Sequence, residues 1–228
     1  MKILARAAPT LLAALATAFA AAAWAAPPLA PALQNELDRA VLEHESGHLE
    51  AARAAFESLA ARGVPAAMFD LGVMHLHGEL PGASRATGLA LVQRAAQGGF
   101  VTAQIMLGKV YEEGELAPRD LVLAMNWYEL AATAGSAEAQ VAIATAYYLG
   151  RGRPKDMAKA ARWYREAATL GDVGAQYLIA SMYESGDGVE RDLRLARYWY
   201  EIAARNGDIA APDKVRQIDA EIAADAKT

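Results

Sequence analysis

The small and hydrophobic residues of this chain recur with a constant spacing of 36 residues over most of its length. When residues 102–137, 138–173 and 174–209 are aligned, the same residue types fall at the same positions, and a degenerate fourth copy occupies residues 66–101. A repeat of this length is typical of solenoids, in which each unit buries its hydrophobic face against its neighbours. The matching positions are Gln104, Gln140 and Gln176; Tyr111, Tyr147 and Tyr183; Gly114, Gly150 and Gly186; Trp127-Tyr128, Trp163-Tyr164 and Trp199-Tyr200; and, in the degenerate copy, Leu71-Gly72, Gly78, Ala95-Ala96 and Gly99.

Each copy has the pattern of two helices joined by a turn. Leu107, Gly108 and Tyr111 fall on one face of a first helix, where glycine allows a close approach and tyrosine fills the gap between helices. A glycine three residues after the tyrosine ends this helix, and the Trp-Tyr and Ala-Ala pairs form the buried face of a second helix. The pattern therefore predicts an all-α solenoid of helix–turn–helix repeats. Residues that prefer the N-cap precede each second helix, namely Ser84, Asp120, Asp156 and Asp192.

Both ends of the array have the pattern of caps. Residues 33–65 form a shortened N-terminal repeat, in which Leu33, Leu37, Val41 and His44 trace the first helix. Residues 210–228 form a C-terminal capping helix and tail with a single apolar stripe. A helix that is apolar on one side only is what closes the open end of a solenoid. The stripe consists of Ala211, Val215, Ile218 and Ile222.

These positions resemble the Sel-one-like repeat (SLR) family, a 36-residue relative of the tetratricopeptide repeat. The segment Lys159-Ala160-Ala161-Arg162-Trp163-Tyr164 carries the second half of the family pattern in full, and the resemblance covers residues 66–209. The resemblance implies a right-handed α-α superhelix that acts as a non-catalytic adaptor between proteins. It also implies, for an exported bacterial member, a role in signalling regulation, envelope function or host contact.

The first 25 residues have the pattern of a secretory signal peptide. Lys2 and Arg6 form a positive start, an uncharged apolar stretch follows, and Ala23-Trp24-Ala25 fits the cleavage pattern. Residues 26–32 are rich in proline and predict an extended leader. We expect a periplasmic or secreted protein that does not span a membrane once residues 1–25 are removed. The alternative is an uncleaved membrane anchor, for which this stretch is short.

Composition and charge narrow the classes of function. The chain is 54% hydrophobic and 7% aromatic, with alanine dominating, which favours helices in close contact. Without Lys2 and Arg6 it has 20 basic and 27 acidic residues, a net charge of −7 that disfavours nucleic-acid binding. There is no cysteine, which excludes disulfides, a thiol nucleophile and cysteine-ligated zinc. We expect no cofactor.

One short segment matches a catalytic motif. His44-Glu45-Ser46-Gly47-His48 fits the H-E-x-x-H pattern of zinc peptidases, in which two histidines one helical turn apart bind the metal. That motif needs an unbroken helix, whereas Gly47 lies where the repeat places its helix-ending glycine. The segment is therefore interpreted as a turn. An alternative use of the histidines is a metal site formed at one edge of two neighbouring units by His44, His48, His75 and His77.

The predicted partner site lies on the side of each first helix that faces away from Leu107, Gly108 and Tyr111. In related superhelical repeats this side lines a concave groove, and its apolar character suits an extended or helical segment of a protein partner. The alternative is that several of these residues only pack neighbouring first helices together. The predicted groove residues are Phe69, Val73, Leu76, Ile105, Lys109, Glu113, Val141, Tyr148, Leu149 and Tyr177, with His77, Glu112, Thr145, Ser181 and Glu184 beside them. Tyr148 and Tyr177 are the principal predicted contacts.

Overall fold

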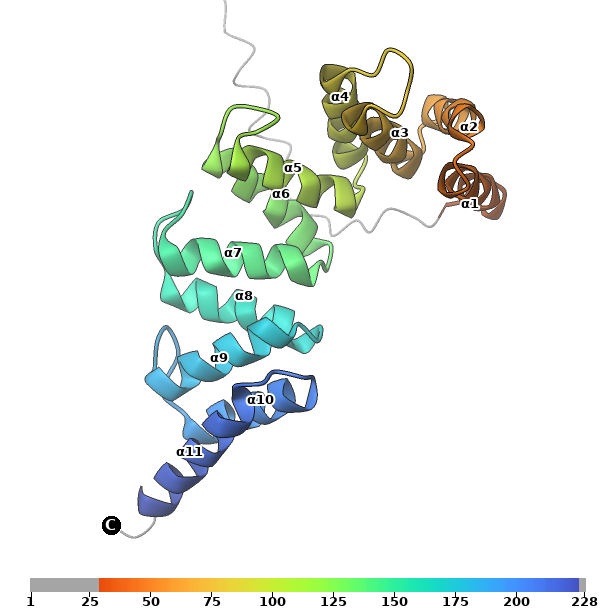
Figure 1. Ribbon diagram of the computed structural model, residues 1–228. Helices are drawn as coiled ribbons and strands as arrows, with labels where there is room; N and C mark the ends of the chain where they lie inside the picture. The colour runs from red at the N-terminus through yellow and green to blue at the C-terminus, as the bar shows by residue number, and fades with distance from the viewer. Residues whose placement is uncertain (1–28, 226–228) are drawn as a thin grey trace, which may run out of the picture.

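Residues 29–225 are described by the computed structural model, and they form eleven helices without a strand (Figure 1). The predicted signal peptide, residues 1–25, and the start of the leader lie outside this range. The first helix begins at Pro31, inside the stretch 26–32 predicted to be extended, because proline is well tolerated at the first position of a helix. The helices are α1 (Pro31–Glu45), α2 (Leu49–Ala61), α3 (Pro65–His77), α4 (Arg85–Gln97), α5 (Val101–Glu113), α6 (Leu121–Thr133), α7 (Ala137–Leu149), α8 (Met157–Thr169), α9 (Val173–Ser185), α10 (Leu193–Arg205) and α11 (Ala211–Asp225).

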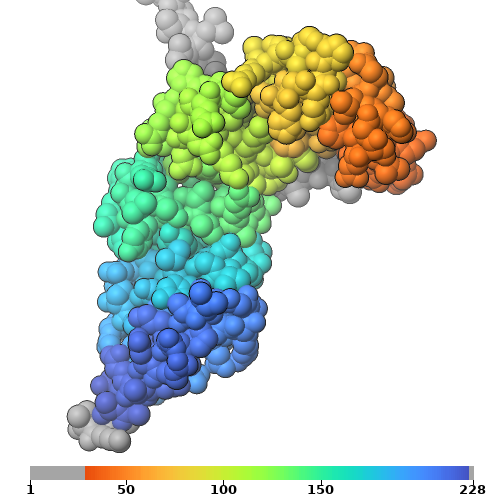
Figure 2. Space-filling view, viewed as in Figure 1, coloured from red at the N-terminus to blue at the C-terminus, as the bar shows by residue number. Residues whose placement is uncertain are grey.

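The helices stack in chain order into an open superhelix. Each packs mainly against the helix before it and the helix after it, and the stack follows an arc (Figure 2). Helices α3 to α10 are all 13 residues long and form four units, α3–α4, α5–α6, α7–α8 and α9–α10, here called units 1 to 4. Helices α1 and α2 precede them, and α11 follows. The predicted all-α, right-handed α-α superhelix is confirmed.

The helix ends have the local chemistry that the repeat predicts. Asp120, Asp156 and Asp192 each accept a hydrogen bond from a backbone N–H in the first turn of the second helix, at 2.9 to 3.0 Å. Gly114 ends the first helix of unit 2 in the left-handed conformation, with φ of 82°, as its equivalents do in the other units. Local sequence therefore sets where these second helices begin and where the first helices of the four units end.

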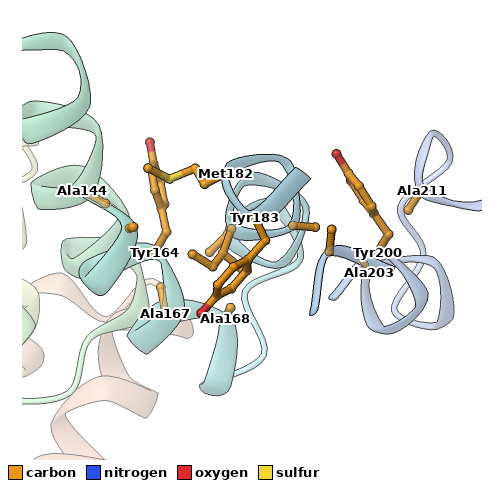
Figure 3. Packing of buried hydrophobic residues seen from close by; sticks show 14 of the residues in the cluster. Ala144, Tyr164, Ala167, Ala168, Met182, Tyr183, Tyr200, Ala203 and Ala211 are labelled. Carbon is orange, nitrogen blue, oxygen red and sulfur yellow. The ribbon is translucent and has the colours of Figure 1, made fainter. Parts of the chain in front are cut away.

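In units 2 to 4 the core is built from alanines and one large tyrosine on each second helix. Tyr128, Tyr164 and Tyr200 are all at most 3% exposed, and the alanines around them are almost fully buried. Figure 3 shows Tyr164, Tyr183 and Tyr200 among the alanines of neighbouring helices. Small residues let the helix backbones approach, so a single ring fills each remaining space.

A glycine brings each of two loops into contact with the preceding unit. Gly188, with φ of 71°, follows α9 and touches the backbone of α8, so that a Cβ atom there would overlap the carbonyl oxygen of Met157. Gly152 approaches the carbonyl oxygen of Leu121 in the same way in the unit before. These loops can pack only because a side chain is absent.

Buried glutamines connect successive units. The amide groups of Gln104, Gln140 and Gln176 donate hydrogen bonds of 3.1 to 3.2 Å to carbonyl oxygens in the second helix of the preceding unit, those of Ala96, Ala132 and Ala168 respectively. The Gln176 oxygen accepts a hydrogen bond of 3.0 Å from Asn206, whereas the Gln104 and Gln140 oxygens have no hydrogen-bond partner among the described residues. A buried polar atom without a partner costs free energy.

Leu170 occupies in unit 3 the position that Asn206 occupies in unit 4. The two backbones match, with φ and ψ of −82° and 0° at Leu170 and −90° and 7° at Asn206, and Leu170 is 55% exposed. We expect Leu170→Asn to stabilise the protein by about 1 kcal/mol, because the new amide reaches the Gln140 oxygen. Urea unfolding followed by circular dichroism measures this change. Leu170→Ala is the control, since it removes the exposed leucine without supplying a donor; an equal gain from both variants would contradict the prediction.

Candidate functional site

The predicted groove residues lie on α3, α5, α7 and α9, and the surfaces of these four helices are here called the first-helix face. Four of these residues are exposed, and Tyr148 at 37% and Leu149 at 52% are the exposed apolar ones. The other six are half-buried. The exposed residues are Lys109, Glu113, Tyr148 and Leu149; the half-buried residues are Phe69, Val73, Leu76, Ile105, Val141 and Tyr177.

Most of the half-buried residues take part in internal packing. The Phe69 ring lies against Phe100 with centroids 5.3 Å apart, and the Tyr177 ring meets the edge of Tyr200 at 5.0 Å. Ile105 and Val141 pack against neighbouring core clusters. Among the predicted groove residues, the apolar side chains left exposed are therefore Tyr148 and Leu149 at the end of α7.

Unit 3 differs from its neighbours in a polar contact beneath this face. In unit 2 the Tyr128 hydroxyl donates to Glu112 at 2.9 Å, and in unit 4 Tyr200 donates to Glu184 at 2.7 Å. Tyr148 stands at the position of these glutamates in unit 3, so Tyr164 shares a hydrogen bond with Thr145 instead, at 2.9 Å. Tyr148 therefore does not accept a hydrogen bond from the tyrosine of its second helix, as Glu112 and Glu184 do, and its side chain is exposed.

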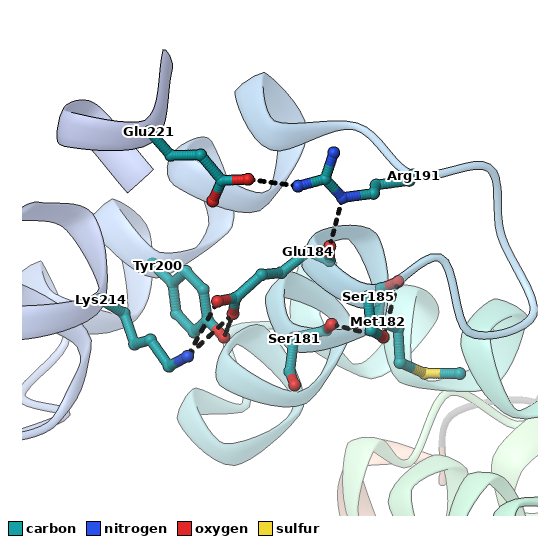
Figure 4. A network of polar contacts seen from close by, with 8 residues as sticks. All are labelled: Ser181, Met182, Glu184, Ser185, Arg191, Tyr200, Lys214 and Glu221. Atoms are coloured by element: carbon teal, nitrogen blue, oxygen red, sulfur yellow. Dashed lines mark hydrogen bonds and ion pairs between the residues drawn. The ribbon is translucent and has the colours of Figure 1, made fainter. Parts of the chain in front are cut away.

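Glu184 is held by several donors at the C-terminal end of the first-helix face (Figure 4). Lys214 Nζ lies 2.9 and 3.1 Å from its two carboxylate oxygens, beside the hydrogen bond from Tyr200. Burial raises the pKa of Glu184, but the hydrogen bonds from Tyr200 and Lys214 outweigh it and leave the pKa below its usual value. Burial is the largest cause that raises the pKa of Tyr200, and the hydrogen bond to the Glu184 carboxylate raises this pKa further. Glu184 thus fastens α11 to unit 4.

An ion pair also links neighbouring first helices in the middle of the array. Lys109 Nζ of α5 lies 2.7 Å from Glu138 Oε1 of α7. Both side chains are about half exposed, so the pair adds little stability. It shows that α5 and α7 come within contact distance of each other at these side chains.

A cavity of about 140 Å³ opens between α5, α6 and α7. Its walls include Ala142, Met125 and Arg151, none of which was among the predicted site residues. The full lining is Glu112, Leu121, Met125, Ala142, Thr145, Ala146 and Arg151. Aligning the repeats does contain a signal for it, because Ala142 and Arg151 both differ in kind from the residues at the same positions of the other units.

A second cavity, of about 250 Å³, lies between α1 and α2. Charged side chains border it, and one of them, Glu36, forms an ion pair with Arg62. Polar residues of this kind suit the end of a solenoid. The lining residues of this cavity are Glu36, Arg39, Ala40, Glu43, Ala55, Ser58 and Leu59.

The H-E-x-x-H segment does not lie on one helix. Helix α1 ends at Glu45, Gly47 has φ of 79°, and His48 stands at the residue before α2 without a capping hydrogen bond from its side chain. The two histidines therefore are not spaced by one helical turn, as the zinc motif requires. The segment is a turn, in agreement with the interpretation from the repeat.

The four histidines contact carboxylates or the backbone. His44 Nε2 lies 2.7 Å from Glu79 Oε2, and His77 Nδ1 lies 3.2 Å from Glu79 Oε1. His48 Nδ1 lies 2.7 Å from Glu43, and His75 accepts a hydrogen bond from the Ser84 N–H. Within residues 29–225 no group of three or more histidine, aspartate or glutamate side chains is placed to hold a metal ion. The geometry thus gives no support to the alternative metal site.

Asp70 of α3 is a half-buried carboxylate. Burial raises its pKa to about 6, against a smaller lowering by His44. Because the folded pKa lies above the usual 3.8, the protonated group contributes stability below about pH 4, which is lost as the pH rises through about 6. We expect Asp70→Asn to raise stability by about 1 kcal/mol at pH 7.5 and to change it little at pH 4. Thermal unfolding at both pH values measures this, with the exposed Asp38→Asn as control; a gain of equal size at both values would refute the prediction.

Comparisons with known proteins agree with this architecture. The sequence model of the Sel1 repeat matches residues 65–100, 101–136, 137–172 and 173–208. These ranges begin one residue before the predicted ones, at the first residue of α3, α5, α7 and α9. No curated protein matches the chain.

Two solved structures are similar along most of the array. A Sel1 repeat protein from Oxalobacter formigenes has a TM-score of 0.67 and 28% identity, and the match covers 78% of this chain and 75% of that one. A protective antigen present in uropathogenic Escherichia coli strains, with an SLR fold, has a TM-score of 0.64 and 32% identity. That match covers 70% of this chain but only 34% of the antigen, so this chain spans about a third of its length.

Proposed function

Since the chain belongs to the Sel1 repeat family, we propose that it is a non-catalytic scaffold that binds a protein or peptide partner along its first-helix face. The observation that carries this proposal is the exposed apolar surface of Tyr148 and Leu149 in the middle of the array. Exposed aromatic and aliphatic side chains beside half-buried ones are the usual centre of a protein interface. The histidine segment supports no hydrolytic alternative, because a turn separates its two histidines.

We place this scaffold in the periplasm or outside the cell, with a role in signalling or in the envelope. The signal-peptide pattern of residues 1–25 supports this location, and within residues 29–225 no helix is long and apolar enough to cross a membrane. Mass spectrometry of the protein from a periplasmic fraction tests this location: we expect a chain that starts at Ala26, whereas an intact chain in the membrane fraction would refute it.

Site-specific crosslinking tests the binding surface. A photoreactive amino acid is placed at Tyr148 in one variant and at Arg165, an exposed residue of α8, in another, and both are irradiated in the native cells. We expect a discrete crosslinked partner from position 148 and not from position 165. Crosslinks from position 165 alone would place the interface on the second helices and overturn the assignment.

The captured partner then allows a quantitative test. We expect Tyr148→Ala to weaken binding by a factor of about 10 to 30, as loss of a central aromatic contact does. Tyr198→Ala is the matched control, because Tyr198 is 53% exposed but lies on the second helix α10, so its loss leaves affinity unchanged. Tyr177→Ala is less informative, since Tyr177 also packs against Tyr200. Equal affinities of Tyr148→Ala and the unmodified protein would refute the proposal.

A further inference from the structure

The cavity between α5, α6 and α7 is lined by a small residue of α7 at a position where the other first helices carry longer ones. Ala142 of α7 stands at the position of Asp70, Met106 and Leu178 in α3, α5 and α9. Met125, 2% exposed, and Ala146, 3% exposed, also line the cavity and are part of the hydrophobic core. The hollow of about 140 Å³ is apolar where these three residues line it, and charged side chains stand at its edge.

The size of this cavity fits one apolar side chain. An apolar protein cavity of about 150 Å³ accommodates a benzene molecule, which has six carbon atoms. The side chains of leucine, methionine and phenylalanine are similar in size to benzene. The cavity therefore suits the anchoring side chain of a bound segment better than it suits an intact small metabolite, which usually needs several hundred Å³.

The charge at the rim is also peculiar to this unit. Arg151, in the loop after α7, stands where the other units carry an acid, Glu79, Glu115 or Asp187. Arg151 forms no ion pair with any described residue, whereas Arg153 in the same loop is paired with Glu129 at 2.6 Å. Lys155, four residues further, lies 6.0 Å from the Tyr148 ring. Unit 3 therefore combines the small residue Ala142 with the basic residue Arg151, in a protein whose net charge is negative.

Glu112 is the one acidic side chain that lines the cavity, and its contacts limit where a ligand carboxylate can bind. Its Oε2 accepts the hydrogen bond from Tyr128, and its backbone oxygen accepts one of 3.0 Å from Arg119 Nε. A second carboxylate beside Glu112 would be repelled. An acidic group of a ligand is therefore stabilised only on the side of the rim formed by Arg151.

We propose that this cavity and Arg151 form the anchor subsite for the partner, which takes an apolar side chain with an acidic residue next to it. The inference rests on the proposed function for its biological meaning, but the subsite can be tested without the partner. The occupant is a peptide segment in which leucine, methionine or phenylalanine enters the cavity while a neighbouring aspartate or glutamate pairs with Arg151.

Two short peptides and nuclear magnetic resonance provide the direct test. The protein without residues 1–25 is labelled at its methionine methyl groups and titrated with N-acetyl-Leu-Glu-amide or N-acetyl-Leu-Lys-amide. We expect a saturable shift of the Met125 methyl signal in the millimolar range, with the glutamate peptide binding about fivefold more tightly, as expected for one exposed ion pair. Absence of a saturable shift with either peptide overturns the inference, and so does equal binding of both.

Two variants that copy residues from other units give the controls. Ala142→Met places the residue of α5 at this position and should fill the cavity, so that the Met125 shift is lost while the melting temperature is kept. Arg151→Glu places a glutamate as in unit 2, and should make the lysine peptide the tighter ligand. An unchanged titration in Ala142→Met, or an unchanged preference in Arg151→Glu, refutes the subsite. If Ala142→Met fails to fold, Ala142→Leu, the residue of α9, replaces it.

The same variants separate this inference from the proposed function. If Tyr148→Ala weakens binding of the crosslinked partner and Ala142→Met leaves it unchanged, the first-helix face is the interface and the anchor subsite is wrong. If the peptides bind as expected but position 148 crosslinks to nothing, the subsite stands and the proposed interface fails. Loss of partner binding in both variants supports both.

Discussion

Replacing Gly188 by alanine is expected to lower the free energy of unfolding by about 3 kcal/mol, one of the two largest effects anticipated for a single change in this protein. Gly188 has φ of 71°, a conformation that costs a residue with a Cβ atom about 1 kcal/mol. The new methyl group would also overlap the backbone of Met157 and Ala158. Backbone atoms of a helix cannot rotate aside as a side chain can, so unit 4 must move away from unit 3.

Chemical unfolding of the variant, followed by circular dichroism, measures this loss. Gly207→Ala is the matched control, because Gly207 also has a positive φ, of 101°, but a Cβ atom there meets nothing within 4 Å. We expect the control to lose only about 1 kcal/mol. If both variants lost the same free energy of unfolding, the backbone conformation alone would account for the effect. The contact between the loop and α8 would then contribute nothing to stability.

Replacing Tyr200 by alanine is expected to cost about 3 to 5 kcal/mol, the range for removal of a buried aromatic ring. Tyr200 is fully buried, and it contacts the edge of Tyr177 while its hydroxyl donates to Glu184. Loss of the ring leaves a cavity between α9, α10 and α11. We therefore expect the C-terminal helix to detach before the rest of the array unfolds.

The variant Tyr200→Phe separates the contribution of the ring to stability from that of the hydroxyl. The phenylalanine keeps the packing, and Glu184 keeps both contacts with Lys214, so we expect a loss of only about 1 kcal/mol. Because the pKa of Glu184 is lowered in the folded protein, its contribution is present near neutral pH and is lost as the pH falls through the acidic range. The Phe variant should therefore differ less from the unmodified protein at pH 3 than at pH 7. Thermal unfolding at both pH values checks this, and a loss as large as that of Tyr200→Ala would contradict it.

The repeat and its helix ends were predictable because they depend on local chemistry. The N-cap aspartates and the glycines that end the first helices act on residues within one turn, and both recur every 36 residues. The turn at Gly47 was predictable for the same reason, because the glycine stands at the helix-ending position of the repeat. Sequence spacing was thus enough to set aside the zinc motif.

The detailed surface of the site was harder to predict, because it depends on how neighbouring units are rotated against each other. Phe69 and Tyr177 were predicted on the same basis as Tyr148, yet the first two pack against Phe100 and Tyr200 while Tyr148 is exposed. The alignment of the repeats shows that Ala142 is smaller than Met106 and Leu178 at the same position, but it does not show what lies beside Ala142. Only the packing of α5, α6 and α7 shows that it borders a cavity.

The stacking of each helix mainly on its neighbours in the chain has a consequence for how the protein is made. Nearly all contacts join segments that are close in sequence, a topology associated with fast folding. Each unit can close as soon as the next first helix is available, because the buried glutamine of that helix completes the contact with the unit before it. A chain that emerges from its N-terminus, from a ribosome or through a translocation channel, can therefore fold progressively, without waiting for its last residue.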